Sequence, residues 1–339
     1  MIIMEEPKEL YKSRFAPYIN GFLIEKKQKG LYDTKVLKSF MLEFDKFFQE
    51  YSIIDLNITE DVILQWRNTR ISDGKRTLYY KYTAWVNFCR YLCSIGIECY
   101  IPRPTREGSQ NDYIPYIYTS QEIELIFTTV DKLRIDINRN TTPMFAMPAI
   151  CRLLYSTGMR ISEVLSLKNE DLDFNKQLIY INRAKNGQQR LAVMNDSLFS
   201  VLKEYRTFRN FIPIHDIDLP DRHFFTTQMG KKCSIGNIRV WFHKTLSYAE
   251  IPTQTYVNSP RIHDLRHTAA VHSLQKLISL GTDIYSELPL ISMFLGHKNI
   301  KSTAHYIRLT TQMFPDLIKM QSKTAFVFPD MKFINTDAL

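Results

Sequence analysis

The sequence contains little glycine, few cysteines and no long apolar run. Glycine accounts for 11 of 339 residues, about 3%, against roughly 7% in an average protein. This scarcity disfavours turn-rich sandwiches and propellers and favours helices. The longest apolar run, residues 144–151, includes Pro148, whereas a membrane-spanning helix needs about 20 apolar residues. The sequence therefore predicts a soluble, mostly helical protein.

The five cysteines are an odd number, and the N-terminal residues lack the basic flank and apolar stretch of a signal peptide. Both features predict a protein of the reducing cytoplasm. Cys89, Cys93 and Cys99 lie close together in the sequence, but Cys89 and Cys93 stand four apart on an apolar helical pattern and no fourth ligand accompanies them. We therefore expect core thiols and no metal site.

Acidic side chains are outnumbered by basic ones. The chain has 44 Lys and Arg against 35 Asp and Glu, a net charge of +9. Residues 1–112 hold 17 basic and 15 acidic side chains (net +2), which leaves 27 and 20 (net +7) for residues 113–339. An excess of this kind is typical of proteins that bind nucleic acid. The length favours two domains over one.

The N-terminal third has the pattern of a small helical bundle. Apolar side chains recur at helical spacing over three stretches, residues 34–51, 59–66 and 78–95. Residues 102–112 contain two prolines and no apolar side chain. We expect a helical domain over residues 1–101, a linker over 102–115, and a second domain over 116–339.

Two turns of the second domain each present a basic side chain. A buried helix over residues 143–155 should end at Gly158, which places Arg160 in a turn between two helices. Strand-like segments then flank an Asn-Gly turn, so Lys185 should lie at the tip of a β-hairpin. Further helical patterns cover residues 123–133, 197–208, 234–249, 263–277 and 288–295. The fold class predicted is mainly α with a small β-hairpin or sheet.

Polar residues gather in three short clusters near the C-terminal end. His263 and Arg266 stand three apart, so in a helix they share one face with Cβ atoms about 5 to 6 Å apart. Gly296 is placed to end a helix and to turn His297 outward, and Tyr306 follows nine residues later. Taken singly, such residues are most often surface charges or packed core groups. Their combination points to a site.

These clusters resemble the tyrosine recombinases, or phage-type integrases. That family has an Arg after a Gly in a turn, a Lys on a hairpin, a His-x-x-Arg pair, a Leu-Gly-His and a nucleophilic Tyr. Matching residues occur here in family order: Arg160, Lys185, His263, Arg266, His297 and Tyr306. Arg266 and His297 are 31 residues apart (297 − 266), a spacing similar to that of transposon- and integron-like mobile-element recombinases.

The resemblance implies a two-domain clamp on double-stranded DNA. Residues 1–101 are similar, by architecture alone, to the family's helical, SAM-like core-binding domain, and residues 116–339 to its mixed α/β catalytic domain of the integrase type. The expected partners are DNA with specific recombination sites and further copies of the chain in a tetrameric synapse, with the C-terminal tail exchanged between protomers. The expected location is the cytoplasm, at the nucleoid. No small-molecule cofactor, metal, ATP or membrane is implied.

The implied roles fit the chemistry of a phosphodiester. Guanidiniums bind the non-bridging oxygens of a phosphorane as a charged, bidentate fork, which suits Arg160 and Arg266. By resemblance, His263 and His297 complete this clamp, His263 takes the tyrosine proton, and Lys185 protonates the departing 5′ oxygen. Tyr306 attacks phosphorus and forms a 3′-phosphotyrosyl link.

Other positions carry weaker signals. Glu163 is expected to pair with and orient an active-site cation. His267, His272 and His305 are interpreted as helix-packing or hydrogen-bonding residues and stay outside the predicted site. Basic clusters that could contact DNA phosphates comprise Lys75, Arg76, Lys81, Arg103, Arg106, Lys231, Lys232 and Arg239.

Two alternative functions remain. A type IB topoisomerase would share this chemistry but relax supercoils as a monomer, and the spacing from Leu-Gly-His to Tyr306 speaks against it. A catalytically silent DNA-binding regulator on the same fold should have lost part of the catalytic set, whereas all six residues are present.

Overall fold

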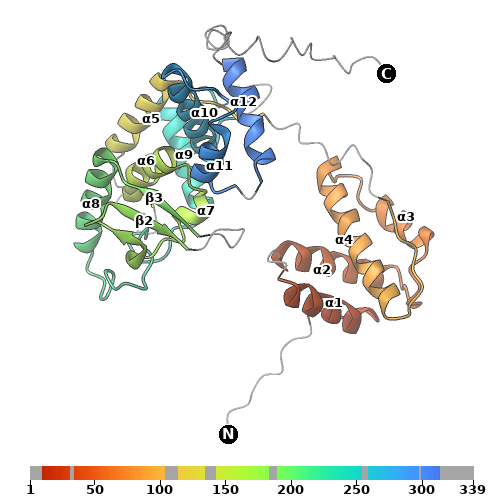
Figure 1. Cartoon of the computed structure of the whole chain (residues 1–339). Coiled ribbons are helices and arrows are strands. Elements are labelled where there is room, and N and C mark those ends of the chain that lie inside the picture. Colours follow the sequence, from red (N-terminus) through yellow and green to blue (C-terminus); the bar gives the residue numbers. More distant parts are fainter. Residues whose placement is uncertain are drawn as a thin grey trace, which may run out of the picture. The chain divides into compact units, whose positions relative to one another are not determined.

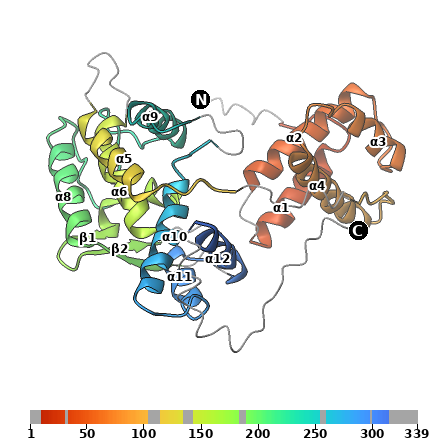
Figure 2. The same cartoon turned by 90° about the horizontal axis from the view of Figure 1, so that it is seen from above.

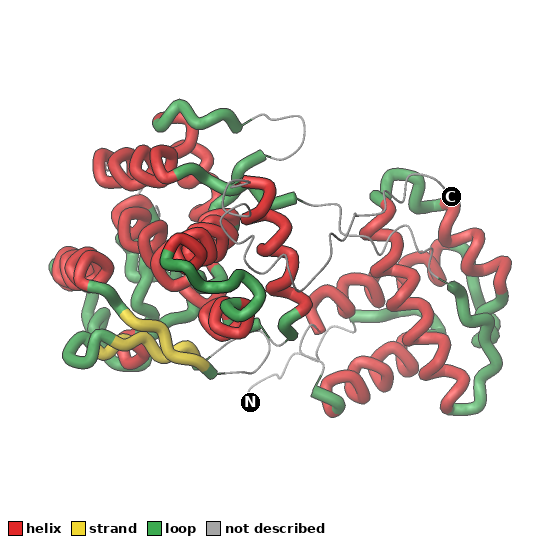
Figure 3. The backbone as a smooth tube through the Cα atoms, turned by 45° about the horizontal axis from the view of Figure 1, so that its top comes forward, coloured by secondary structure: helices red, strands yellow, loops and turns green. Residues whose placement is uncertain are grey.

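The computed structural model describes residues 10–30, 34–103, 114–133, 143–182, 189–253, 259–297 and 299–313. The chain divides into two compact units, residues 1–112 and 113–339 (Figure 1). Helices dominate both units, and the strands form one small sheet in the second (Figure 3). The prediction of a mainly helical chain with a small sheet is confirmed. In the described part of the chain, no helix is both long enough and apolar enough to cross a membrane.

The first unit is a helical bundle around an aromatic core. Its described helices are α1 (Ala16–Gln28), α2 (Thr34–Glu50), α3 (Glu60–Asn68) and α4 (Lys75–Ser94). Phe44 stacks on Trp85 with ring centroids 4.0 Å apart, and Phe15 stacks on Phe48 at the same distance. Such pairs combine large apolar burial with favourable ring geometry, which explains how a short bundle closes its core.

Two features of this unit differ from what the sequence predicts. Helix α1 was not predicted, because it buries only Ile19, Phe22 and Leu23 and leaves Ile24 exposed, so its apolar periodicity is weak. Of the cysteines expected in the core, Cys89 is buried, but Cys93 is exposed. The prediction of a core thiol is therefore wrong for Cys93.

The second unit is built around helix α6 (Met147–Thr157). Its sequence is apolar on most sides and seven of its eleven residues are buried. Helices α5 (Ser120–Lys132), α8 (Asp196–Asn210), α9 (Ile235–Tyr248) and α10 (Asp264–Ser279) pack against it, as Figure 2 shows for α5. A helix with so broad an apolar surface requires this kind of enclosure.

The sheet is antiparallel with the order β1-β2-β3. Its strands are β1 (Leu172–Asp173), which was not predicted, β2 (Leu178–Ile181) and β3 (Arg190–Val193). Ile181 pairs with Arg190 across β2 and β3. Directly opposed residues share one face of a sheet, so Arg190 lies on the same face as buried Ile181. The predicted hairpin tip with Lys185 lies outside the described residues.

Helices α11 (Leu288–Leu295) and α12 (Lys301–Met313) pack together and against α10. Their shared cluster includes Leu274, Ile291, Leu295, Tyr306 and Leu309, all buried. This packing holds the predicted nucleophile against the helix that carries Arg266. The predicted C-terminal tail, from residue 314 onward, lies outside the described residues.

Candidate active site

Two helix C-termini meet at one arginine. Helix α6 ends at Gly158 (φ +57°) and α11 at Gly296 (φ +64°), both in the left-handed region that favours glycine. Arg266 donates hydrogen bonds from Nη1 to the carbonyl oxygen of Gly158 and from Nη2 to that of Leu295, the latter at 2.8 Å. Carbonyls at helix C-termini carry partial negative charge, so this junction stabilises a buried guanidinium.

Arg266 also fixes the state of His297. Its Nη2 lies 3.0 Å from Nε2 of His297. Because a guanidinium only donates, Nε2 must accept, so the ring hydrogen sits on Nδ1 and is donated to Oγ1 of Thr303 at 2.8 Å. Burial, followed by the charges of Arg266 and Arg160, lowers the pKa of His297 to about 4. The ring is therefore neutral at neutral pH.

Burial also acts on Arg266 itself, which is 2% exposed. Its pKa falls to about 10, first through burial and then through the charge of Arg160. The guanidinium nevertheless stays charged at neutral pH.

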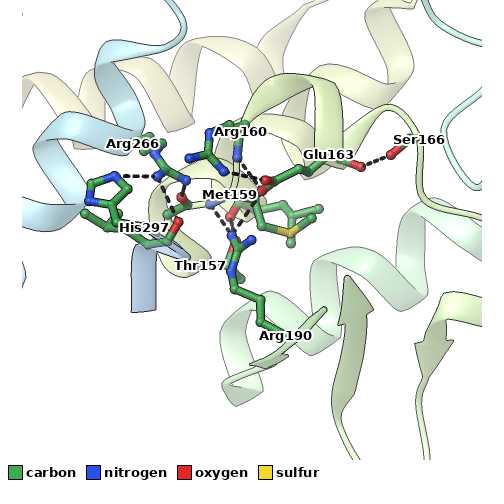
Figure 4. A network of polar contacts seen from close by, with 11 residues as sticks. Thr157, Met159, Arg160, Glu163, Ser166, Arg190, Arg266 and His297 are labelled. Atoms are coloured by element: carbon green, nitrogen blue, oxygen red, sulfur yellow. Dashed lines mark hydrogen bonds and ion pairs between the residues drawn. The ribbon is translucent and has the colours of Figure 1, made fainter. Parts of the chain in front are cut away.

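A single carboxylate joins two further arginines (Figure 4). Arg160 precedes the short helix α7 (Ile161–Val164) and donates from Nη1 to Oε1 of Glu163 at 2.7 Å. Oε2 of Glu163 accepts from the Arg160 backbone N–H and from Nη2 of Arg190, both at 3.0 Å. Burial alone would raise the pKa of Glu163, but the Arg160 N–H and the charge of Arg190 outweigh it and lower the pKa. The carboxylate is therefore ionised.

Arg190 is a member of this network that the sequence analysis missed. Its side chain is 11% exposed, and its Nη1 is buried without a hydrogen-bond partner among the described residues. A Cβ on Gly296 would lie 2.8 Å from that Nη1. The guanidinium thus packs directly against the turn that presents His297. Its position in the sequence could have indicated this role, because Arg190 begins a predicted strand five residues after Lys185 and faces the same side of the sheet as buried Ile181.

Tyr306 lies beside the arginine cluster. It is 2% exposed, and its Oη lies 2.7 Å from Nδ1 of His267. The tyrosine ring is nearly parallel to that of His297, with an interplanar angle of 11° and centroids 6.2 Å apart. Burial raises the pKa of Tyr306, although the charges of Arg266 and Arg160 act in the opposite direction. The phenol is therefore protonated.

His263 stands at the start of helix α10. Burial lowers its pKa to about 4, and the charges of Arg266 and Arg261 contribute. Its ring centroid lies 5.1 Å from that of His267, at an interplanar angle of 90°. A cavity of about 460 Å³ opens beside it, lined among others by Arg239, His243, Arg261 and His263. The predicted residues Arg160, His263, Arg266, His297 and Tyr306 thus belong to one region, with Glu163 among them.

Comparison with known proteins identifies the family. The family model described as "Phage integrase family" matches residues 118–313. The chain belongs to the phage integrase family. Tyrosine recombinase XerC of Chlamydia caviae is 27% identical over 241 residues, 71% of this chain and 70% of that protein. A putative integrase/recombinase, y4rB of Sinorhizobium fredii, is 25% identical over 271 residues, 78% of this chain and 83% of the relative.

Solved structures show the same fold. A post-cleavage complex of the XerH site-specific recombinase with its palindromic difH substrate has a TM-score of 0.63 and 19% identity, covering 90% of this chain and 84% of that one. The Tn1549 transposon integrase with transposon right end DNA has a TM-score of 0.59 and 16% identity, covering 85% and 94%. The integrase-type fold expected from the sequence is therefore confirmed.

The basic residues predicted to contact DNA differ in their availability in this integrase-family chain. The structure exposes Lys75, Arg76, Arg103, Lys231, Lys232 and Arg239, while Arg106 lies outside the described residues. Lys81 is different, because its side chain is 8% exposed and its Nζ lies 2.6 Å from Glu43 and 2.7 Å from Asp73. Its charge is neutralised within the first unit, which weighs against the predicted DNA contact.

The described part of the integrase-family chain contains no group of three or more His, Cys, Asp or Glu side chains arranged to hold a metal ion. Its polar cluster is instead rich in guanidiniums and neutral imidazoles. Such groups bind an anion and move protons.

Proposed function

We propose that the chain is a site-specific DNA recombinase that cleaves and rejoins strands through a covalent bond to Tyr306. One observation carries this proposal: the buried hydroxyl of Tyr306 shares a region with Arg160, Arg266 and His297, although the chain separates Tyr306 from Arg160 by 146 residues (306 − 160). Membership of the phage integrase family supports it.

The arginines of this region suit the charge of a reacting phosphodiester. The Arg160 side chain is 20% exposed and is the guanidinium that a DNA phosphate reaches from solvent, while buried Arg266 supplies charge from behind. Attack on phosphorus builds negative charge on the non-bridging oxygens, and fixed cations stabilise it without reorganisation. An incoming phosphate also opposes the arginine charges that depress the pKa of His297, so this pKa rises and the ring more readily becomes an imidazolium that adds to the positive charge facing the phosphate.

The reaction begins when Oη of Tyr306 attacks phosphorus and the bond to the 5′ oxygen breaks. The family resemblance gives His263 the role of proton acceptor and Lys185 that of proton donor to the departing 5′ oxygen. The 3′-phosphotyrosyl bond retains the energy of the phosphodiester, so the hydroxyl of another strand can reverse the step without ATP or a metal ion.

The remaining roles follow the same proposal. The first unit serves as a core-binding domain that closes with the second around duplex DNA. The tail after helix α12 docks on a neighbouring copy in a tetrameric synapse, in the cytoplasm at the nucleoid. The spacing of 31 residues between Arg266 and His297 supports integration or excision of a mobile element.

A nicked suicide duplex tests the proposal, because loss of a short cleaved strand traps the covalent adduct. The DNA site is obtained by selecting bound duplexes from a random pool with the Tyr306→Phe variant. The unchanged chain should form an adduct, whereas Tyr306→Phe should bind but form none. Tyr285→Phe, at a side chain 66% exposed, is the matched control and should behave like the unchanged chain.

The alternatives give different results in the same assay. A silent regulator forms no adduct with the unchanged chain. A topoisomerase relaxes supercoiled plasmid as a monomer without exchanging strands between two sites. Adducts that persist in Tyr306→Phe would show that another residue is the nucleophile.

A further inference from the structure

One residue outside the predicted set contacts the hydroxyl of Tyr306. Nδ1 of His267, on helix α10, lies 2.7 Å from Oη of Tyr306, on helix α12. His263, the proton acceptor suggested by the family resemblance, lies one helical turn earlier, and its ring packs edge to face against that of His267. His263 therefore contacts His267, and His267 in turn contacts Tyr306.

The protonation state of His267 decides whether its ring can accept this hydrogen bond. Burial, then the nearby His263 ring and the charge of Arg266, lower the pKa of His267 to about 3, so its ring is neutral. A neutral ring carries its hydrogen on one nitrogen only, and with that hydrogen on Nε2 the unprotonated Nδ1 of His267 accepts the hydroxyl hydrogen of Tyr306.

We propose that His267 is a further catalytic residue, which in place of His263 takes the proton from Oη of Tyr306 as that oxygen bonds to phosphorus. In this step the Oη–H bond breaks, the Oη–P bond forms, the bond from phosphorus to the 5′ oxygen breaks, and His267 becomes an imidazolium. When a 5′ hydroxyl attacks the phosphotyrosyl bond, the proton returns to Oη. This inference deepens the proposed function and depends on it.

The surrounding charges explain why the transfer waits for DNA. The groups that face His267 are His263 and Arg266 on its own helix, Arg261 just before it, and His305 and Tyr306 on α12. The arginines disfavour an imidazolium in the free chain. A bound phosphate diester offsets their charge, and the growing bond to phosphorus makes the phenol more acidic. Both effects favour the transfer only in the reacting complex.

The test uses His267→Asn in the full-length chain on the suicide duplex. The Asn carboxamide oxygen can accept the hydrogen bond from Tyr306 but cannot take its proton. Adduct formation should slow by about 10²-fold, a typical contribution of a general base, with DNA binding unchanged. The matched control is His272→Asn, since Nδ1 of His272 makes a similar 2.8 Å contact to the hydroxyl of Tyr155 from the same helix. That variant should react at the unchanged rate.

A second measurement separates proton transfer from positioning. A fluorinated tyrosine at position 306, with a phenol pKa below the assay pH, needs no base and should restore adduct formation in His267→Asn. In the otherwise unchanged chain, adduct formation should slow as the pH falls and His267 takes up a proton, and the fluorinated residue should remove this slowing. This measurement keeps the test valid if His267→Asn does not fold.

The inference is overturned if His267→Asn forms the adduct at the unchanged rate. It is also overturned if the fluorinated tyrosine fails to restore adduct formation in His267→Asn, or restores adduct formation only in His263→Asn. The unchanged chain is the reference for the proposed function. If it forms no adduct, the proposed function fails, whereas an adduct with an unaffected His267→Asn contradicts only the role of His267.

Discussion

Nη2 of Arg190 lies 3.0 Å from Oε2 of Glu163, and this contact joins strand β3 to the turn that presents Arg160. Glu163 is 1% exposed and shares its carboxylate between the two arginines. The opposite side of the Arg190 guanidinium packs against Gly296. Three segments that are distant in sequence are thereby fixed around one carboxylate, which positions Arg160 and the turn before His297.

Replacing Arg190 should destabilise the second unit. Arg190→Met removes one of the two cations from a buried carboxylate, and a hydrogen bond to a charged group contributes about 2 kcal/mol. We expect the free energy of unfolding in urea, monitored for this unit, to fall by about that amount. Lys176→Met removes an exposed ion pair with a side chain 68% exposed and should change it by less than about 0.5 kcal/mol. Equal stability of the two variants would contradict the buried network.

A matched pair of glycines tests the contact with Arg190. Gly296→Ala adds a Cβ 2.8 Å from Nη1 of Arg190 at φ +64°, whereas Gly281→Ala, at φ +88°, adds one with nothing within 4 Å. Both incur the left-handed cost of about 1 to 2 kcal/mol, but only Gly296→Ala must also displace the guanidinium. Thermal unfolding should therefore show a larger loss for Gly296→Ala, together with slower adduct formation. A loss no larger than that of Gly281→Ala would show that the packing against Gly296 is unimportant.

Acid should destabilise the second unit in a defined window. Burial lowers the pKa of His263 and His297 to about 4 and that of His267 to about 3, from 6.5. An unfolded chain therefore binds protons at higher pH than the folded one, so stability is complete above pH 6.5 and declines as the pH falls toward 4. Denaturation at several pH values should show this decline, and His297→Gln should reduce it. A stability independent of pH in this range would indicate that these rings take up protons at the same pH in the folded and unfolded chains.

An exposed basic residue and a buried, ion-paired one should differ in their effect on DNA affinity. Exposed Arg239 on helix α9 can release a counterion from DNA, so Arg239→Gln should weaken binding and reduce the slope of log K against log salt by about 1. Lys81→Gln breaks ion pairs with Glu43 and Asp73, so it should lower the stability of the first unit and leave the salt slope unchanged. Fluorescence anisotropy across a salt series measures both slopes. An equal effect of the two changes would contradict the assignment.

The sequence predicted most helices and the position of the turns that carry the site, because those features depend on local patterns. The glycines at 158 and 296 end helices where the sequence places them, since only a residue without a Cβ adopts that conformation easily. Helix α1 escaped prediction because its burial comes from neighbouring aromatic side chains rather than from its own periodicity.

Arg190 and His267 were not predicted because their contacts depend on tertiary packing. The role of Arg190 arises from strand pairing and from the approach of Gly296, neither of which is a local feature of the sequence. His267 directly follows Arg266, but its contact with Tyr306 depends on how α12 packs on α10. The pairing of Lys81 was not predicted for the same reason, because Glu43 belongs to another helix.

The most direct test of the account is to identify the residue that becomes attached to DNA. The unchanged chain is incubated with its selected duplex, denatured and digested with protease, and the peptide that carries nucleotide is sequenced by mass spectrometry. The account predicts a phosphodiester on the hydroxyl of Tyr306, joined to the 3′ end of the cleaved strand. A nucleotide attached to any other side chain, or a 5′ linkage, would contradict it.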